Sequence, residues 1–142
     1  MNQEKINIWE QYNFNKKNYK SSYDYLIEQK NNFISRTKGI LTLEVESKNS
    51  SDYQSMSYSL YVVCPKLGDY RKEILCVLEN NLTDGYPVTI MSSGLTNKVF
   101  SFVEEKDFLD KLEEMLSIPT IKKTIQNLYN QSIENNESSR SQ

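Results

Sequence analysis

The chain has 142 residues, of which 37% are hydrophobic and 25% charged, and its formal net charge is −2. A chain of this size and composition is expected to fold as one globular domain with its own core, and the near-balance of charge argues against a broad nucleic-acid-binding surface. Histidine is absent, which removes the commonest general base and the commonest metal ligand of proteins.

The sequence shows no sign of a membrane segment or a secretory leader. No run approaches the roughly 18 apolar residues that span a bilayer, and residues 1–20 lack the apolar core of a signal peptide. Cys64 and Cys76 have neither a metal-ligand nor a C-x-x-C spacing. We therefore expect a cytoplasmic protein without a membrane partner. Its frequent Asn, Lys, Ile, Tyr and Ser residues are typical of an AT-rich genome.

Residues 1–20 are expected to form an N-terminal arm that mixes aromatic residues with lysines. Aromatic rings stack on unpaired bases and lysines neutralise phosphates, so this composition suits a binder of single-stranded nucleic acid. The arm has no arginine and no recognised RNA-binding motif. We therefore favour an arm whose aromatic side chains pack on the sheet.

The first predicted helix follows the arm. Ser21 and Asp24 have the spacing of a capping box, and Gly39 stands where a left-handed residue would end the helix. Apolar residues recur between them at helical spacing, which predicts one apolar face. That face comprises Tyr23, Leu26, Ile27, Phe33 and Ile34.

Two alternating segments, 40–47 and 56–64, predict strands with one buried face each. Pro65 ends the second strand because proline has no N–H for a sheet ladder. The polar loop between the segments favours an antiparallel pair. The inward-facing residues are Leu41, Leu43 and Val45 in the first strand and Tyr58, Leu60, Val62 and Cys64 in the second.

The stretch from Lys66 to Ile90 begins ambiguously. Its apolar residues fit helical spacing from Leu67 to Leu78, but the run ILCVL is apolar on both sides, as in an interior strand covered on two faces. We favour the strand, in which one face comprises Tyr70, Ile74, Cys76 and Leu78 and the other Leu75 and Val77. This geometry keeps Cys64 and Cys76 too far apart for a disulfide, roughly 20 Å at about 3.3 Å per residue.

The remaining elements complete an α+β fold. Asp84-Gly85 marks a turn, and a strand follows in which Pro87 suggests an edge or a first position. Segment 99–105 is a last strand with Phe100 and Phe102 on one face, and two helices follow it. We expect a single antiparallel sheet of four to five strands, with an N-terminal helix and two C-terminal helices packed mainly on one face. The domain would span 21–133, followed by a disordered tail, 134–142.

The acidic residues and the two cysteines are the candidate reactive groups, and for each we favour a structural role over a catalytic one. The acidic residues that follow the last strand could hold a cation or work as an acid–base pair, but at helical spacing they lie opposite the apolar face and are expected to be solvated. Both cysteines lie in apolar runs and are expected in the core. We therefore predict no catalytic residue, no cofactor and no metal. The acidic residues are Glu104, Glu105, Asp107, Asp110, Glu113 and Glu114.

The favoured function is that of a small non-catalytic protein that binds another macromolecule, such as an inhibitor, an antitoxin-like or immunity-like protein, or an adaptor; this analogy rests on size and composition alone. The alternative is a nucleic-acid-binding accessory protein that uses the basic, aromatic N-terminal third, and an enzyme built on carboxylates or tyrosines is the least favoured class. Another protein is the preferred partner, and the sequence leaves the oligomeric state open. The candidate partner-binding residues are Trp9, Tyr12, Phe14 and Tyr53.

Overall fold

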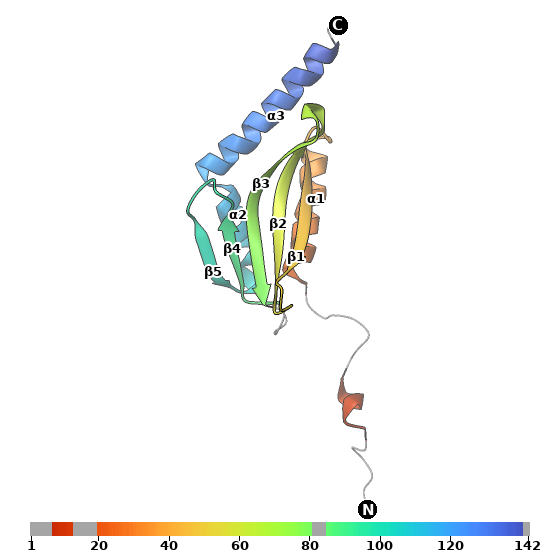
Figure 1. Ribbon diagram of the computed structural model, residues 1–142, viewed down its shortest axis with the longest axis vertical. Coiled ribbons are helices and arrows are strands. Elements are labelled where there is room, and N and C mark those ends of the chain that lie inside the picture. The colour runs from red at the N-terminus through yellow and green to blue at the C-terminus, as the bar shows by residue number, and fades with distance from the viewer. Residues whose placement is uncertain (1–6, 13–19, 81–84, 141–142) are drawn as a thin grey trace, which may run out of the picture.

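The computed structural model describes residues 7–12, 20–80 and 85–140, and their side chains up to residue 134. Its centre is a five-stranded antiparallel sheet in the order β1-β2-β3-β4-β5, so every strand pairs with its neighbour in sequence. One helix precedes the sheet and two follow it (Figure 1). The predicted α+β architecture is therefore confirmed.

Helix α1 spans Ser22–Arg36 and begins with the predicted capping box. The Ser21 hydroxyl accepts a hydrogen bond from the Asp24 N–H, and the Asp24 carboxylate accepts one from the Ser21 N–H, each at 3.1 Å. Gly39 has a φ of 78° and ends the turn after the helix. Of the predicted apolar face, Leu26 is fully buried, whereas the Tyr23 ring packs against Tyr58 near the surface.

Strands β1 (Thr42–Asn49) and β2 (Ser55–Cys64) form the predicted antiparallel pair, in register from Thr42↔Val63 to Asn49↔Met56. Side chains alternate between the two faces of these strands as the sequence indicated: Leu43, Tyr58 and Leu60 are buried on the face that packs against the helices. A short 3-10 turn, η2 (Pro65–Leu67), then reverses the chain.

Strand β3 (Tyr70–Asn80) lies in the centre of the sheet, between β2 and β4, so the strand interpretation of this stretch is confirmed. Cys76 lies opposite Ser59, while Cys64 lies opposite Tyr70. Both thiols are free, as predicted. The two positions lie six residues apart along β3, which keeps the sulfur atoms apart.

A β-bulge changes the predicted faces of β3. Leu60 pairs with Leu75 and Tyr61 pairs with Glu73, so Ile74 is an extra residue without a pair on β2. At such a bulge two successive side chains oppose one residue of the neighbouring strand, and Ile74 and Leu75 are both fully buried in the helix-side core. The prediction that Ile74 shares a face with Cys76 and Leu78 was wrong for this reason.

Strands β4 (Val88–Ser92) and β5 (Val99–Val103) complete the sheet. Pro87 immediately precedes β4, so this interior strand keeps its ladder of hydrogen bonds. A second register irregularity lies between β4 and β5. It separates Phe100, which packs against the core, from Phe102, which is exposed, and the prediction that these two rings share a face was wrong.

Helices α2 (Glu105–Leu116) and α3 (Pro119–Arg140) pack on the same side of the sheet as α1 (Figure 1). Helix α3 continues past residue 133, so the structure has helix at 134–140, where the sequence suggested a disordered tail. The core lies between this helical layer and the sheet. Its helical members include Leu26, Phe108, Leu112, Met115, Ile121 and Leu128.

The two faces of β3 predict losses of stability of different size for the same substitution. Leu75→Ala should lower the free energy of unfolding by about 2–5 kcal/mol, because it leaves a cavity in the core. Leu78→Ala, on the other face and 37% exposed, should cost less than about 1.5 kcal/mol. Urea denaturation of both variants measures the difference, and equal losses would contradict the assigned faces.

Candidate protein-binding surface

The side of the sheet away from the helices is here called the open face. The strand registers place one row of side chains across it, running through Glu46, Ser59, Cys76, Met91 and Val99 from β1 to β5. A second row runs through Lys48, Ser57, Leu78 and Thr89. Among the described residues, no helix covers these two rows.

The β3–β5 part of the open face is apolar. Directly paired residues lie close enough for their side chains to touch, so Met91 adjoins Cys76 on one side and Val99 on the other, and Leu78 lies beside Cys76 on β3. Leu78 is 37% and Val99 50% exposed, and the other two are partly exposed. We call these four residues the open-face patch. Contiguous exposed apolar surface of this kind marks interaction sites.

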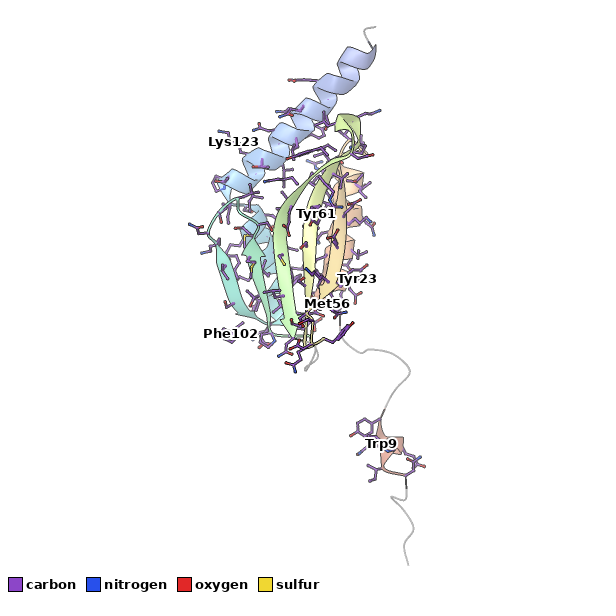
Figure 2. The ribbon with its side chains drawn as sticks, viewed as in Figure 1. Trp9, Tyr23, Met56, Tyr61, Phe102 and Lys123 are labelled. Atoms are coloured by element: carbon purple, nitrogen blue, oxygen red, sulfur yellow. The ribbon has the colours of Figure 1, made fainter. Side chains whose placement is uncertain are left out.

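The β1–β3 part of the open face is charged and largely satisfied within itself. Arg71 forms ion pairs with Glu44 at 3.3 Å and Glu46 at 3.0 Å. Its guanidinium carbon also lies 3.8 Å from the ring centre of Tyr61, at a position visible in Figure 2. These groups need no further contact, which distinguishes this half of the face from the patch.

Phe102 stands at the β5 edge of the patch. Thr89 on β4 faces two residues, Ser101 and Phe102, because β5 carries an extra residue here. Phe102 has a φ of 56° and its side chain is 84% exposed (Figure 2). A bulky residue rarely adopts this left-handed conformation, which costs on the order of 1–3 kcal/mol. The edge therefore holds a large aromatic ring in water at an energetic cost, a combination that suits a binding surface.

The loop between β1 and β2 borders the same surface. A hollow of about 460 Å³ has Asp52 and Gln54 of the loop on one side and Leu78 and Thr89 of the open face on another. The Asp52 carboxylate accepts hydrogen bonds from the Ser50 hydroxyl at 2.6 Å and the Gln54 N–H at 3.1 Å, and these bonds lower the pKa of Asp52. The loop is thereby ordered beside the patch.

The structure describes three of the four residues that the sequence suggested for partner binding. Trp9 and Tyr12 belong to η1 (Ile8–Gln11) and its cap, with ring centres 5.1 Å apart, and Trp9 stands apart from the sheet in Figure 2. Tyr53, at the tip of the β1–β2 loop, is 72% exposed. Phe14 lies outside the described residues. Of the three described residues, Tyr53 alone belongs to a loop that adjoins the patch.

Sequence reasoning missed the open-face patch, although a signal for it was present. The apolar run Ile74–Leu78 predicted a strand covered on two faces. The structure covers one face with helices and leaves Cys76 and Leu78 on the other. Met91 and Val99 belong to short strands, and their position beside β3 follows only from the registers.

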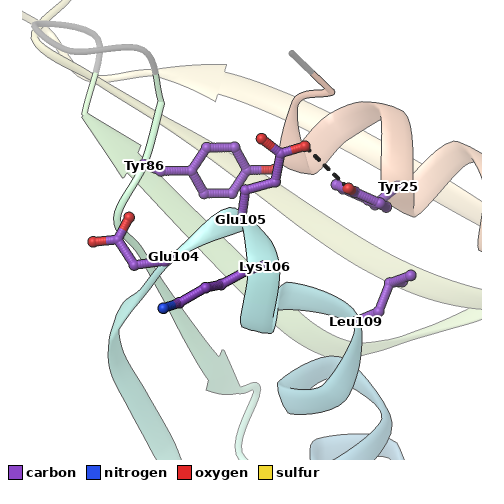
Figure 3. Close-up of a pocket in the computed structure, with 6 residues that line it drawn as sticks. All are labelled: Tyr25, Tyr86, Glu104, Glu105, Lys106 and Leu109. Atoms are coloured by element: carbon purple, nitrogen blue, oxygen red, sulfur yellow. Dashed lines mark hydrogen bonds between the residues drawn. The ribbon is translucent and has the colours of Figure 1, made fainter.

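A hollow of about 750 Å³ lies where α1 and α2 begin (Figure 3). The Tyr25 hydroxyl donates to the Glu105 carboxylate at 3.1 Å. The Tyr86 hydroxyl donates to the Lys20 carbonyl at 2.8 Å, and the Lys20 N–H reaches Glu105 at 3.4 Å. These bonds connect α1, α2 and the start of β4, so the Tyr25, Tyr86 and Glu105 side chains of this hollow have structural partners.

A second carboxylate, Glu79 at the end of β3, anchors the start of α1. It accepts hydrogen bonds from the Ser22 hydroxyl at 2.6 Å and the Tyr58 hydroxyl at 3.1 Å. Burial raises the pKa of Tyr58, and the negative charge of Glu79 raises it further. Burial likewise raises the pKa of Tyr86. Both phenols therefore stay protonated at neutral pH and serve as donors.

The thiols are not activated. Burial raises the pKa of Cys64 and of Cys76, which disfavours the nucleophilic thiolate. Within the described residues, no three His, Cys, Asp or Glu side chains gather as metal ligands would. No described helix is both long enough and apolar enough to cross a membrane.

Comparisons with known proteins add no relative: no protein-family model, no curated protein and no solved structure matches the chain.

The buried phenols predict a pH dependence of stability. Because folding raises the pKa of Tyr58, its stabilising contribution is complete below the unfolded value near 10 and is lost as the pH rises through the folded value. Tyr58→Phe should cost about 1 kcal/mol at pH 7 and lose less stability than the wild type between pH 10 and 12. Urea denaturation across this range tests it, with exposed Tyr53→Phe as the control; parallel curves for wild type and Tyr58→Phe would contradict it.

Proposed function

We propose that this protein is a small non-catalytic binding protein that docks another protein on the open-face patch. The observation that carries the proposal is the uncovered row Cys76–Met91–Val99 with Leu78 beside it. An apolar centre with a polar rim is the common anatomy of protein interfaces. The charged half of the open face and the β1–β2 loop supply that rim.

Charge indicates the chemistry of the partner. The described open face carries three carboxylates, on Glu44, Glu46 and Glu73, against two cations, on Lys48 and Arg71. A partner with an apolar patch and a basic rim would complement this surface. Nucleic acid fits less well here, because its phosphates would meet carboxylates. The two free thiols suit the reducing cytoplasm in which we place the interaction.

Site-specific photo-crosslinking in the native host tests the proposal. A benzophenone amino acid at Val99 should yield one discrete protein adduct, whereas the same probe at Thr42, on the charged end of the open face, should yield less of it. An adduct with nucleic acid, or equal yields from both positions, would contradict the proposal. An adduct with a second copy of this chain would replace the heterologous partner by a homodimer.

Substitutions in the open-face patch should lower the affinity for the crosslinked partner. Leu78→Lys and Met91→Lys should each weaken binding by more than about 1 kcal/mol, because a charge would be buried without a partner. The matched control is Thr42→Lys, which adds the same charge elsewhere on the face. Calorimetric titration measures all three; unchanged affinity in both patch variants, with the fold intact by circular dichroism, would exclude the patch.

The residues suggested by the sequence remain candidates for additional contacts. Trp9→Ala and Tyr53→Ala should each weaken partner binding by over about 1 kcal/mol while leaving the melting temperature nearly unchanged, since both side chains are more than half exposed. Tyr53→Ala should have the larger effect, because its loop adjoins the patch. A lowered melting temperature with unchanged affinity would assign these residues to folding.

A further inference from the structure

The helix side of the sheet contains an apolar cavity of about 330 Å³. Its floor is formed by strands β1 to β3 and its walls by all three helices. Native cores have few voids larger than a water molecule, and an apolar cavity of roughly 150 Å³ stays dry and binds benzene. The cavity is lined by Phe33, Leu43, Leu60, Val62, Ile74, Leu112, Leu116 and Ile125.

The polar part of the cavity lies on one element. Gln29, Asn32 and Arg36 line it from α1, and their spacing of three and four residues places them along one side of the helix. Among the described residues, the Arg36 guanidinium forms no ion pair and no hydrogen bond. Arg36 also borders the adjoining hollow between α1 and α3. The cavity thus combines an apolar interior with one available cation at its rim.

We propose that this cavity binds an amphiphile with one anionic head group, of the class of medium-chain carboxylates. The apolar tail would lie among the leucine, isoleucine and phenylalanine side chains, out of contact with water. The carboxylate would accept hydrogen bonds from the Arg36 guanidinium, whose planar fork matches two carboxylate oxygens. The amides of Gln29 and Asn32 provide further donors. This site lies on the opposite side of the sheet from the open-face patch and does not depend on it.

Charge decides between this ligand and other apolar molecules. A neutral alcohol of the same length would fill the same space but could not pair with Arg36, and an amine would be repelled by it. Arg36 also stands in the last turn of α1, where a cation stabilises the helix dipole. A purely structural role predicts no preference for an anionic ligand, so ligand selectivity separates the two roles.

The test titrates the full chain with decanoate, decanol and decylamine below their micellar concentrations, using calorimetry and methyl NMR. Decanoate should bind most tightly and shift the methyl signals of Leu60, Ile74 and Ile125. Arg36→Gln should weaken decanoate binding roughly tenfold and leave decanol binding unchanged. Arg71→Gln, the same change on the open face, is the matched control and should leave both affinities unchanged.

A variant that fills the cavity provides a second, independent test. Leu116→Phe adds volume at a partly exposed lining position and should abolish the binding of decanoate and decanol together. Because Arg36 is exposed, Arg36→Gln will fold even if the filled variant does not. Absence of decanoate binding to the wild type, equal binding to Arg36→Gln, or methyl shifts confined to other regions would each overturn the proposal. A dimer that Leu116→Phe converts to a monomer, without decanoate binding, would assign the cavity to a second copy of the chain.

Discussion

The arrangement of this domain depends on one topological constraint: all five strands are joined to their sequence neighbours. Antiparallel neighbours need only short connections, whereas a helix between strands belongs to parallel crossovers. In the described residues the α-helices lie before and after the strands, and α1, α2 and α3 all pack on one face of the sheet (Figure 1). As a result, helices cover only one face of the central strand β3. The apolar side chains of Cys76 and Leu78 on its other face remain at least partly exposed.

The helical layer is fixed to the sheet where α1 and α2 begin. Glu79 receives hydroxyl donors from Ser22 and Tyr58, and Glu105 receives the Tyr25 hydroxyl. Each carboxylate thus joins elements that lie far apart in sequence, and neutral phenols that are buried or half-buried suit this role because they lose little solvation compared with a charged donor. Several of the ten tyrosines therefore have a structural explanation that the sequence pattern could not supply.

Local signals predicted most of the elements but not the relations between them. The capping box at Ser21, the alternation in β1 and β2 and the break at Pro65 depend on neighbouring residues, and the structure bears them out. The faces of Ile74 and Phe102 depend on bulges, which arise from pairing with another strand and leave no period in the sequence. The open-face patch and the cavity require several registers and helix positions at once, so they became visible only in three dimensions.

The apolar character of the open face is not required by the fold. At equivalent positions β1 carries Glu44, Glu46 and Lys48, and this strand pairs with β2 without any irregularity. Polar residues at the positions of Leu78, Met91 and Val99 would likewise keep the sheet pairing, which uses backbone groups, and would reduce the exposed apolar area. Exposure of these side chains in the free protein therefore points to a use outside folding. The exposed apolar strip beside a self-satisfied ion-pair cluster supports the proposal that another protein covers this face.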